Sequence, residues 1–130
     1  DGGVTAEFRF ILIALSSAFL QASTAQPAFP TEFPAGSSPL SPEALTKLVA
    51  GKVFKLKPAT GAEIRVEYRD DWAYFNVGNS SDSGKWKAEG SAVCVEWRRI
   101  PPSCSEMRMV GDTLYTKRAS NGEVLPMHPN

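Results

Sequence analysis

The sequence predicts a mainly β fold, a small antiparallel meander of about seven or eight strands that forms a barrel or a two-layer sandwich, with one short N-terminal helix. Two observations predict the strands. Apolar and charged residues alternate along segments such as Glu63–Arg69, as expected for a strand with one buried and one wet face, and turn signals recur about every 8 to 12 residues. A capped helix start at Ser41 predicts the helix.

The helix is expected to begin after Ser41. Ser41 can cap its N-terminus, and Pro42 suits the first helical position. Leu45, Leu48 and Val49 follow at the spacing that places them on one helix face. We expect this short apolar face to plug one end of the sheet or barrel.

The strands are expected in chain order after this helix, separated by turns rich in glycine, asparagine, serine or proline. They span residues 52–57, 63–69, 72–77, 85–87, 92–98, 104–110, 113–118 and 123–127. The polar run at 79–84 is expected to be a loop. The chain has no internal repeat, and its length fits a single domain.

Residues 1–25 are interpreted as a secretory signal rather than as part of the fold. Arg9 supplies a positive flank, Phe10–Leu20 form a short apolar run, and small residues lead to a cleavage site after Ala25. The apolar run is about half as long as a membrane-spanning helix requires, so we prefer the signal to the alternative, a lone membrane anchor. Residues 1–7 are interpreted either as residues foreign to the protein or as the end of a longer N-terminal segment.

Residues 26–40 are expected to form a flexible, proline-rich tether, and residues 41–130 a disulfide-stapled β domain. Proline lacks a backbone donor, so this tether is expected to join neither a helix nor a sheet. Phe29 and Phe33 within it can contact either the domain or a partner.

The charges restrict the classes of partner. The chain has 14 Lys or Arg against 14 Asp or Glu, and its basic residues are scattered apart from Arg98-Arg99. A net charge near zero gives no electrostatic basis for binding nucleic acid or an anionic membrane. No stable membrane span is expected in the mature form.

Cys94 and Cys104 are the only cysteines, and we expect them to form a disulfide because an exported protein meets an oxidising compartment. A hairpin that pivots near Arg99 places them directly opposite each other on the outer face of two neighbouring strands. A redox-active role is the alternative, but no Cys-x-x-Cys motif supports it. Trp86 and Trp97 are expected to be core residues of adjacent strands.

Several short motifs lie between residues 41 and 125. The most specific are Gly84-x-Trp86, Cys94-x-x-Trp97 and the second cysteine, Cys104. The others are Leu45-Thr46-x-Leu48, Gly51-Lys52, Val66-x-Tyr68, Asp82 ahead of Gly84, and Asn121-Gly122. This set resembles a family of small exported proteins of rhizobia and related proteobacteria. The resemblance implies a signal peptide, one small β domain and a periplasmic or secreted location, but no activity; Asp71-Trp72 departs from it, where a glycine-containing turn is expected.

Trp72, Tyr74 and Phe75 are the candidate ligand- or partner-binding residues. They occupy both faces of one expected strand, so they cannot all point into the core. Ordinary burial, or cover of a sheet edge, is the alternative interpretation.

Residues suited to catalysis are few, and none is assigned a catalytic role. His128 is the only histidine and lies close to the chain terminus, which is a poor place to hold a base within reach of a proton. A hydrolase that uses Asp70, Asp71 and Asp82 is an alternative that requires their loops to meet. Turn chemistry is the simpler interpretation of these three carboxyl groups.

No metal or other cofactor is expected. Two cysteines and one histidine are too few for a structural zinc site. Met107-x-Met109 and Met127-His128 offer ligands that suit Cu(I), so an exported copper-binding protein is a further alternative. On a strand, however, residues two apart are more simply two core positions.

Together these observations favour a non-catalytic, exported binding domain whose partner is a protein or a small apolar ligand. Eight strands leave an interior that side chains can fill or that can hold one small molecule. A barrel with a pocket would favour the small ligand, and a filled interior would favour the protein partner.

Overall fold

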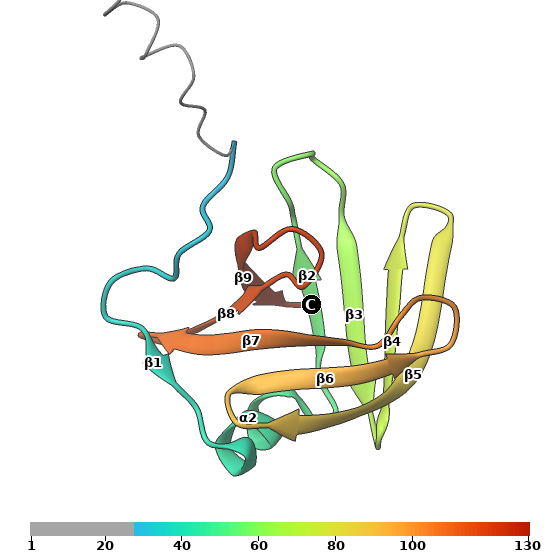
Figure 1. Cartoon of the computed structure of the whole chain (residues 1–130), viewed down its shortest axis with the longest axis horizontal. Helices are drawn as coiled ribbons and strands as arrows, with labels where there is room; N and C mark the ends of the chain where they lie inside the picture. Colours follow the sequence, from blue (N-terminus) through green and yellow to red (C-terminus); the bar gives the residue numbers. More distant parts are fainter. Residues whose placement is uncertain (1–27) are drawn as a thin grey trace, which may run out of the picture.

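Eight strands pair in chain order, and the last of them returns to the first (Figure 1). The computed structural model describes residues 28–130, so the expected signal at 1–25 lies outside the described residues. The strands are β1 (Ser38–Pro39), β2 (Val53–Leu56), β3 (Ile64–Arg69), β4 (Trp72–Val77), β5 (Ser80–Glu89), β6 (Ala92–Trp97), β7 (Ser103–Val110), β8 (Thr113–Lys117) and β9 (Val124–Pro129).

The ring closes where β9 pairs with β2. Phe54 lies opposite Pro129, and Lys55 lies opposite His128. All neighbouring strands of the ring run antiparallel. The predicted mainly β meander is therefore confirmed, and it is a closed eight-stranded barrel rather than a sandwich, with β1 as an additional strand on β7.

Side-chain alternation decides what the barrel encloses. Successive residues of a strand point to opposite faces, so closure places every second residue inside. The buried strand residues that form one hydrophobic cluster are Phe54, Leu56, Tyr68, Ala73, Trp86, Val93, Val95, Met107, Leu114, Leu125 and Met127. The predicted burial of Trp86 and Met107 is confirmed.

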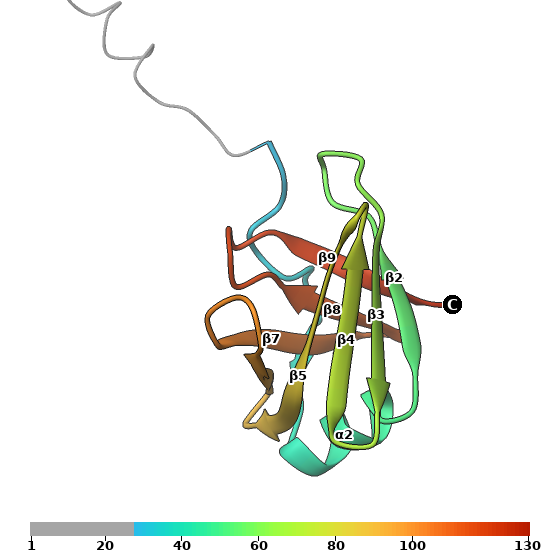
Figure 2. The same cartoon turned by 90° about the vertical axis from the view of Figure 1, so that its right-hand side faces the viewer.

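A single short helix, the only one in the described part of the chain, closes one end of the barrel. Helix α2 (Pro42–Val49) begins as the sequence predicts, because the Ser41 hydroxyl oxygen accepts a hydrogen bond from the Ala44 amide (3.2 Å). Leu45 and Val49 are fully buried in the hydrophobic cluster, and the helix packs against β5 and β6. The expected plug is confirmed, and Figure 2 shows the helix below the strands.

The two ends of the barrel are built differently. We call the end formed by α2 and the turns at 70–71, 90–91 and 111–112 the helix end. The opposite end, formed by the connections at 57–63, 78–79, 98–102 and 118–123, is the mouth end. Strands joined by successive hairpins alternate in direction, so these connections alternate between the two ends.

The prediction of a loop at 79–84 is wrong. The chain turns at Gly78-Asn79, where Gly78 has a positive φ of 58°, and β5 then runs for ten residues from Ser80. Its polar inner positions are tolerated because Asp82 is hydrogen-bonded and Gly84 has no side chain. A Cβ on Gly84 would lie 2.7 Å from the carbonyl carbon of Glu96. The backbone of β6 therefore approaches β5 more closely here than any other residue type would allow.

The proline-rich segment is in contact with the barrel. Ser38 and Pro39 pair with Met109 and Arg108 of β7, although the sequence predicts no ladder in this segment. Proline can still accept hydrogen bonds through its carbonyl and is tolerated at a sheet edge. The ring of Phe33 lies 5.3 Å from the Arg108 guanidinium, so this aromatic residue contacts the domain itself.

The predicted disulfide is confirmed. Cys94 lies directly opposite Cys104 in the ladder between β6 and β7, and the two sulfur atoms are bonded. Cys94 points outward, because its neighbours Val93 and Val95 are buried, and Cys104 lies opposite it on the same face. The bond fastens the two strands close to the connection that joins them.

Replacement of Gly84 by alanine should destabilise the fold through this close approach. We expect Gly84→Ala to lower the free energy of unfolding by at least about 2 kcal/mol, since the new methyl group must displace the β6 backbone. Urea denaturation measures the change. Ser81→Ala, on the exposed face of the same strand, is the control and should stay within about 0.5 kcal/mol of the parent; equal effects of the two changes would contradict the interpretation.

Loss of the disulfide should destabilise the barrel without unfolding it under mild conditions. The bond closes a loop of about eleven residues, which corresponds to about 3 kcal/mol in the chain-entropy model. Denaturation of the parent and of the double variant Cys94→Ser/Cys104→Ser, each with and without reductant, checks this value. Reductant should affect the parent alone, and reactive thiols in the oxidised native protein would contradict the assignment.

Candidate functional site

A cavity of about 580 Å³ is lined by inner-face residues of the barrel and is open at the mouth end. Its walls are mainly apolar side chains from the inner faces of the strands. These residues are Leu56, Ile64, Val66, Tyr68, Phe75, Val77, Val93, Val95, Trp97, Met107 and Met127. Two connections of the mouth end complete the rim, through residues 100–102 and 118–120.

Aromatic contacts fix the wall and the floor of the cavity. Phe75 and Trp97 meet edge to face with ring centroids 5.0 Å apart, and the Trp97 indole N–H donates to the Ser103 hydroxyl (3.1 Å). Deeper in the barrel, Tyr68 meets Trp86 edge to face at 5.3 Å. Burial raises the pKa of Tyr68, so its phenol stays neutral. Trp97, expected in the core, is half-buried: it packs against the hydrophobic cluster and forms part of the cavity wall.

Few polar groups line the cavity, and among the lining residues Arg118 alone carries a charge. The other polar lining side chains are the hydroxyl groups of Tyr68, Ser103, Ser105, Thr116 and Ser120. Arg118 lies in the connection between β8 and β9, at the rim. The cavity is thus an apolar chamber with one cation at its entrance.

A buried carboxylate holds this cation in place. Glu123 is only 2 % exposed. One of its oxygens accepts from Nη1 of Arg118 (3.3 Å), and the other accepts from the Ala59 amide (2.8 Å). Glu123 therefore joins two connections of the mouth end, 57–63 and 118–123. No role for Arg118 or Glu123 is predicted from the sequence, because no local pattern indicates a charged pair that forms only when the barrel closes.

The three candidate binding residues on β4 are divided between two faces. Phe75 lines the cavity. Trp72 and Tyr74 point outward, because Ala73 between them is fully buried, and basic side chains lie over their rings. The Lys85 ammonium is 5.9 Å from the Trp72 ring, and the Arg69 guanidinium is 5.0 Å from the Tyr74 ring.

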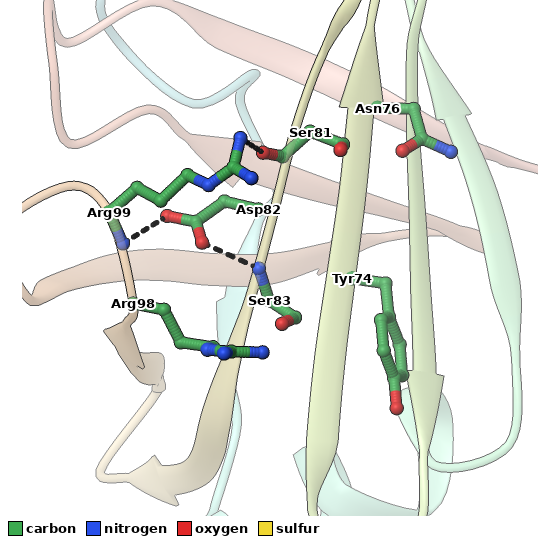
Figure 3. Close-up of a pocket in the computed structure, with 7 residues that line it drawn as sticks. All are labelled: Tyr74, Asn76, Ser81, Asp82, Ser83, Arg98 and Arg99. Atoms are coloured by element: carbon green, nitrogen blue, oxygen red, sulfur yellow. Dashed lines mark hydrogen bonds between the residues drawn. The ribbon is translucent and has the colours of Figure 1, made fainter.

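A second, polar depression of about 360 Å³ lies on the outer surface near the mouth end (Figure 3). Tyr74, Asn76, Ser81, Asp82, Ser83, Arg98 and Arg99 line it. Asp82 is the buried member of this set, and both oxygens of its carboxylate accept backbone hydrogen bonds. One accepts from the Ser83 amide (2.8 Å), and the other from the amides of Arg99 (3.0 Å) and Ile100 (3.2 Å).

Asp82 therefore holds the connection between β6 and β7, which supplies part of the cavity rim. Burial acts to raise the pKa of Asp82, but the hydrogen bonds from the Arg99, Ser83 and Ile100 amides outweigh it and lower this pKa below its usual value. The ionised form is the one that the fold stabilises. Asp82 therefore fastens the loop from within strand β5, and the turn chemistry expected for it is not what the structure shows.

The structure does not bring Asp70, Asp71 and Asp82 together. Asp70 and Asp71 form the turn at the helix end, where Asp71 pairs with Lys85 (3.5 Å) on the surface. Asp82 lies three residues before Lys85 on β5, about 10 Å along the strand, and its oxygens accept hydrogen bonds from backbone amides. The hydrolase alternative therefore has no shared carboxylate site in this geometry.

The groups considered for copper point in opposite directions. Met107 and Met127 are buried inside the barrel, whereas His128 is exposed on its outer face. Residues 28–130 contain no group of three or more histidine, cysteine or acidic side chains arranged to hold a metal ion.

Comparison of the chain with models of protein families, with curated proteins and with solved structures finds no match. Within residues 28–130, no helix combines the length and the apolar character that crossing a membrane would demand.

Protonation of Asp82 should loosen the mouth of the cavity. Because the folded-state pKa of Asp82 lies below its unfolded value, its contribution to stability is complete above the ordinary aspartate pKa of about 3.9 and is lost as the pH falls through the lower, folded value. We expect Asp82→Asn to lower the melting temperature by at least about 4 °C at pH 7 and to flatten its decline below pH of about 4. Asp71→Asn is the exposed control, and a decline as steep in Asp82→Asn as in the parent would contradict this role.

Proposed function

We propose that this protein is a non-catalytic binding protein that acts outside the cytoplasm and holds a small apolar ligand inside its barrel. The observation that carries the proposal is the internal cavity of about 580 Å³ with mainly apolar walls. Cavities of about 300–1,000 Å³, apolar with a few placed polar groups, are typical of small-molecule sites.

The apolar walls define the class of ligand. Eleven of the strand residues around the cavity are aliphatic, aromatic or thioether side chains. Transfer of apolar surface from water into such a chamber is favourable by about 25 cal/mol per Å². A ligand gains this free energy only if its buried part is itself apolar, since the cavity offers few partners for buried polar groups.

The rigidity of the mouth supports binding with a small entropic cost. The disulfide fastens β6 to β7, Asp82 holds the connection between them, and Glu123 joins two further connections. A site that is already ordered loses less conformational freedom when it binds. These contacts therefore favour a preformed pocket.

The extracytoplasmic location rests on two observations. A disulfide such as Cys94–Cys104 persists in oxidising compartments, and the sequence of residues 9–25 has the order of charge, apolar run and small residues of a secretory signal. The resemblance to small exported proteins of rhizobia and related proteobacteria points to the same compartment. A periplasmic or secreted carrier is the form of the proposal that accounts for both.

A small ligand is favoured over a protein partner. The cavity gives the small ligand a site inside the barrel, as a pocket-containing barrel was expected to do. Trp72 and Tyr74 are the outward aromatic residues on which a protein partner could dock, but Lys85 and Arg69 already lie over their rings. Half-buried aromatic rings under basic side chains offer little further apolar area.

Binding of neutral alcohols tests the proposal. We expect a series of straight-chain primary alcohols to displace Nile red from the full chain, with affinity rising about fourfold for each added methylene until the cavity is full. Fluorescence titration measures the binding of Nile red and its displacement by each alcohol. Affinity that keeps rising without a limit, or no binding at all, would count against an enclosed site.

Filling of the cavity provides the matched control. Ser105 lies on the cavity wall, so Ser105→Trp should abolish alcohol binding while the barrel stays folded. Lys87→Trp places the same side chain on the exposed outer face of β5 and should bind as the parent does. Equal binding by both variants would place the ligand outside the barrel and contradict the proposal.

A further inference from the structure

The cavity has different chemistry at its two ends. Its inner part is enclosed by apolar side chains such as Tyr68, Val93 and Met107. At the rim stands Arg118, the only charged residue among those that line it. A ligand that fills this space therefore meets apolar surface along its length and one cation where it emerges.

The Arg118 backbone is fixed by its loop. The Arg118 amide donates to the Glu123 carbonyl (2.8 Å), and the Gly122 amide donates to the Arg118 carbonyl (2.9 Å). These two bonds close the connection between β8 and β9 on itself. Arg118 is thus carried on an ordered support and not on a free loop tip.

The guanidinium group keeps donors for a ligand. Arginine has five N–H donors, and in the described part of the chain the side chain of Arg118 bonds only to Glu123, through Nη1. The Arg118 side chain is 29 % exposed, while that of Glu123 is 3 % exposed. The Glu123 carboxylate is therefore the buried member of the pair, and the Arg118 guanidinium is the member that solvent can reach.

The two ends of the barrel differ in charge, and the mouth end is the more basic. The connections of the mouth end carry Lys57, Arg98, Arg99 and Arg118 against Glu63 and Glu123. The helix end, with α2 included, carries Glu43, Asp70, Asp71 and Asp112 against Lys47. Such an asymmetry attracts an anion to the mouth and raises its rate of association.

We propose that the ligand is a single-chain amphiphile with a carboxylate head, bound with its acyl chain inside the barrel and its head group on Arg118. This inference rests on the proposed function and specifies its ligand class. A carboxylate suits the guanidinium because it accepts two parallel N–H bonds. The buried Glu123 positions the guanidinium and is not itself a binding group.

The experiment compares three head groups on one chain length. Decanoate, decanol and decylamine displace Nile red from the full chain at pH about 7.5 and low salt. The parent should bind decanoate about tenfold or more tightly than decanol, because hydrogen bonds to charged groups contribute that much, and it should bind decylamine most weakly. Equal affinity for decanoate and decanol overturns the inference but leaves the proposed function standing; no binding by any of the three overturns both.

Variants assign the preference to Arg118. Removal of Arg118 alone would leave the buried Glu123 carboxylate without its cation. The double variant Arg118→Gln/Glu123→Gln therefore removes both charges together. It should lose the preference for decanoate while its affinity for decanol stays within about twofold of the parent. Lys87→Gln removes the same charge from an exposed position on β5 and should keep the preference. A double variant that still prefers decanoate, or a Lys87→Gln variant that does not, overturns the assignment.

Discussion

The closure of the sheet between β2 and β9 is the constraint on which the rest of the structure depends. Only two residue pairs form this ladder, assisted by the Asn130 amide, which donates to the Val53 carbonyl (3.0 Å). Until these strands meet, one face of each strand is merely a sheet surface. Once they meet, the same face becomes an interior, the edges of the ring disappear, and every second residue of eight strands is enclosed.

The interior that closure creates is used in two ways. At the helix end, Tyr68 and Trp86 meet edge to face, and Leu45 and Val49 of α2 fill the remaining space. Toward the mouth end the inner positions include small residues such as Ser105, so the wall is not filled to its axis. An eight-stranded barrel holds just enough space for side chains or for one small ligand. In this barrel the residues near the helix end form the packed floor, and the chamber lies above them.

Two buried carboxylates keep that chamber in shape. Asp82 accepts amides from the connection between β6 and β7, and Glu123 ties Arg118 to the backbone of the connection between β2 and β3. A buried carboxylate without partners would be costly, and each of these is satisfied by groups from loops that would otherwise be free to move. The polar residues near the mouth thus act on the geometry of the site, and Arg118 alone presents charge to its interior.

The sequence by itself determined the elements whose signals are local. The capped helix after Ser41, the alternating strands, and the facing positions of Cys94 and Cys104 all follow from spacing and period, because each depends on a few neighbouring residues. The tertiary structure decided the rest. It showed that the polar run at 79–84 belongs mainly to β5. Only glycine fits at position 84, because the backbone of β6 leaves no room for a Cβ. It also divided Trp72 and Tyr74 from Phe75 and joined Arg118 with Glu123 at the mouth. Periodicity can assign residues to faces, but only closure of the ring decides which face is inside and which residues from distant loops meet at its rim.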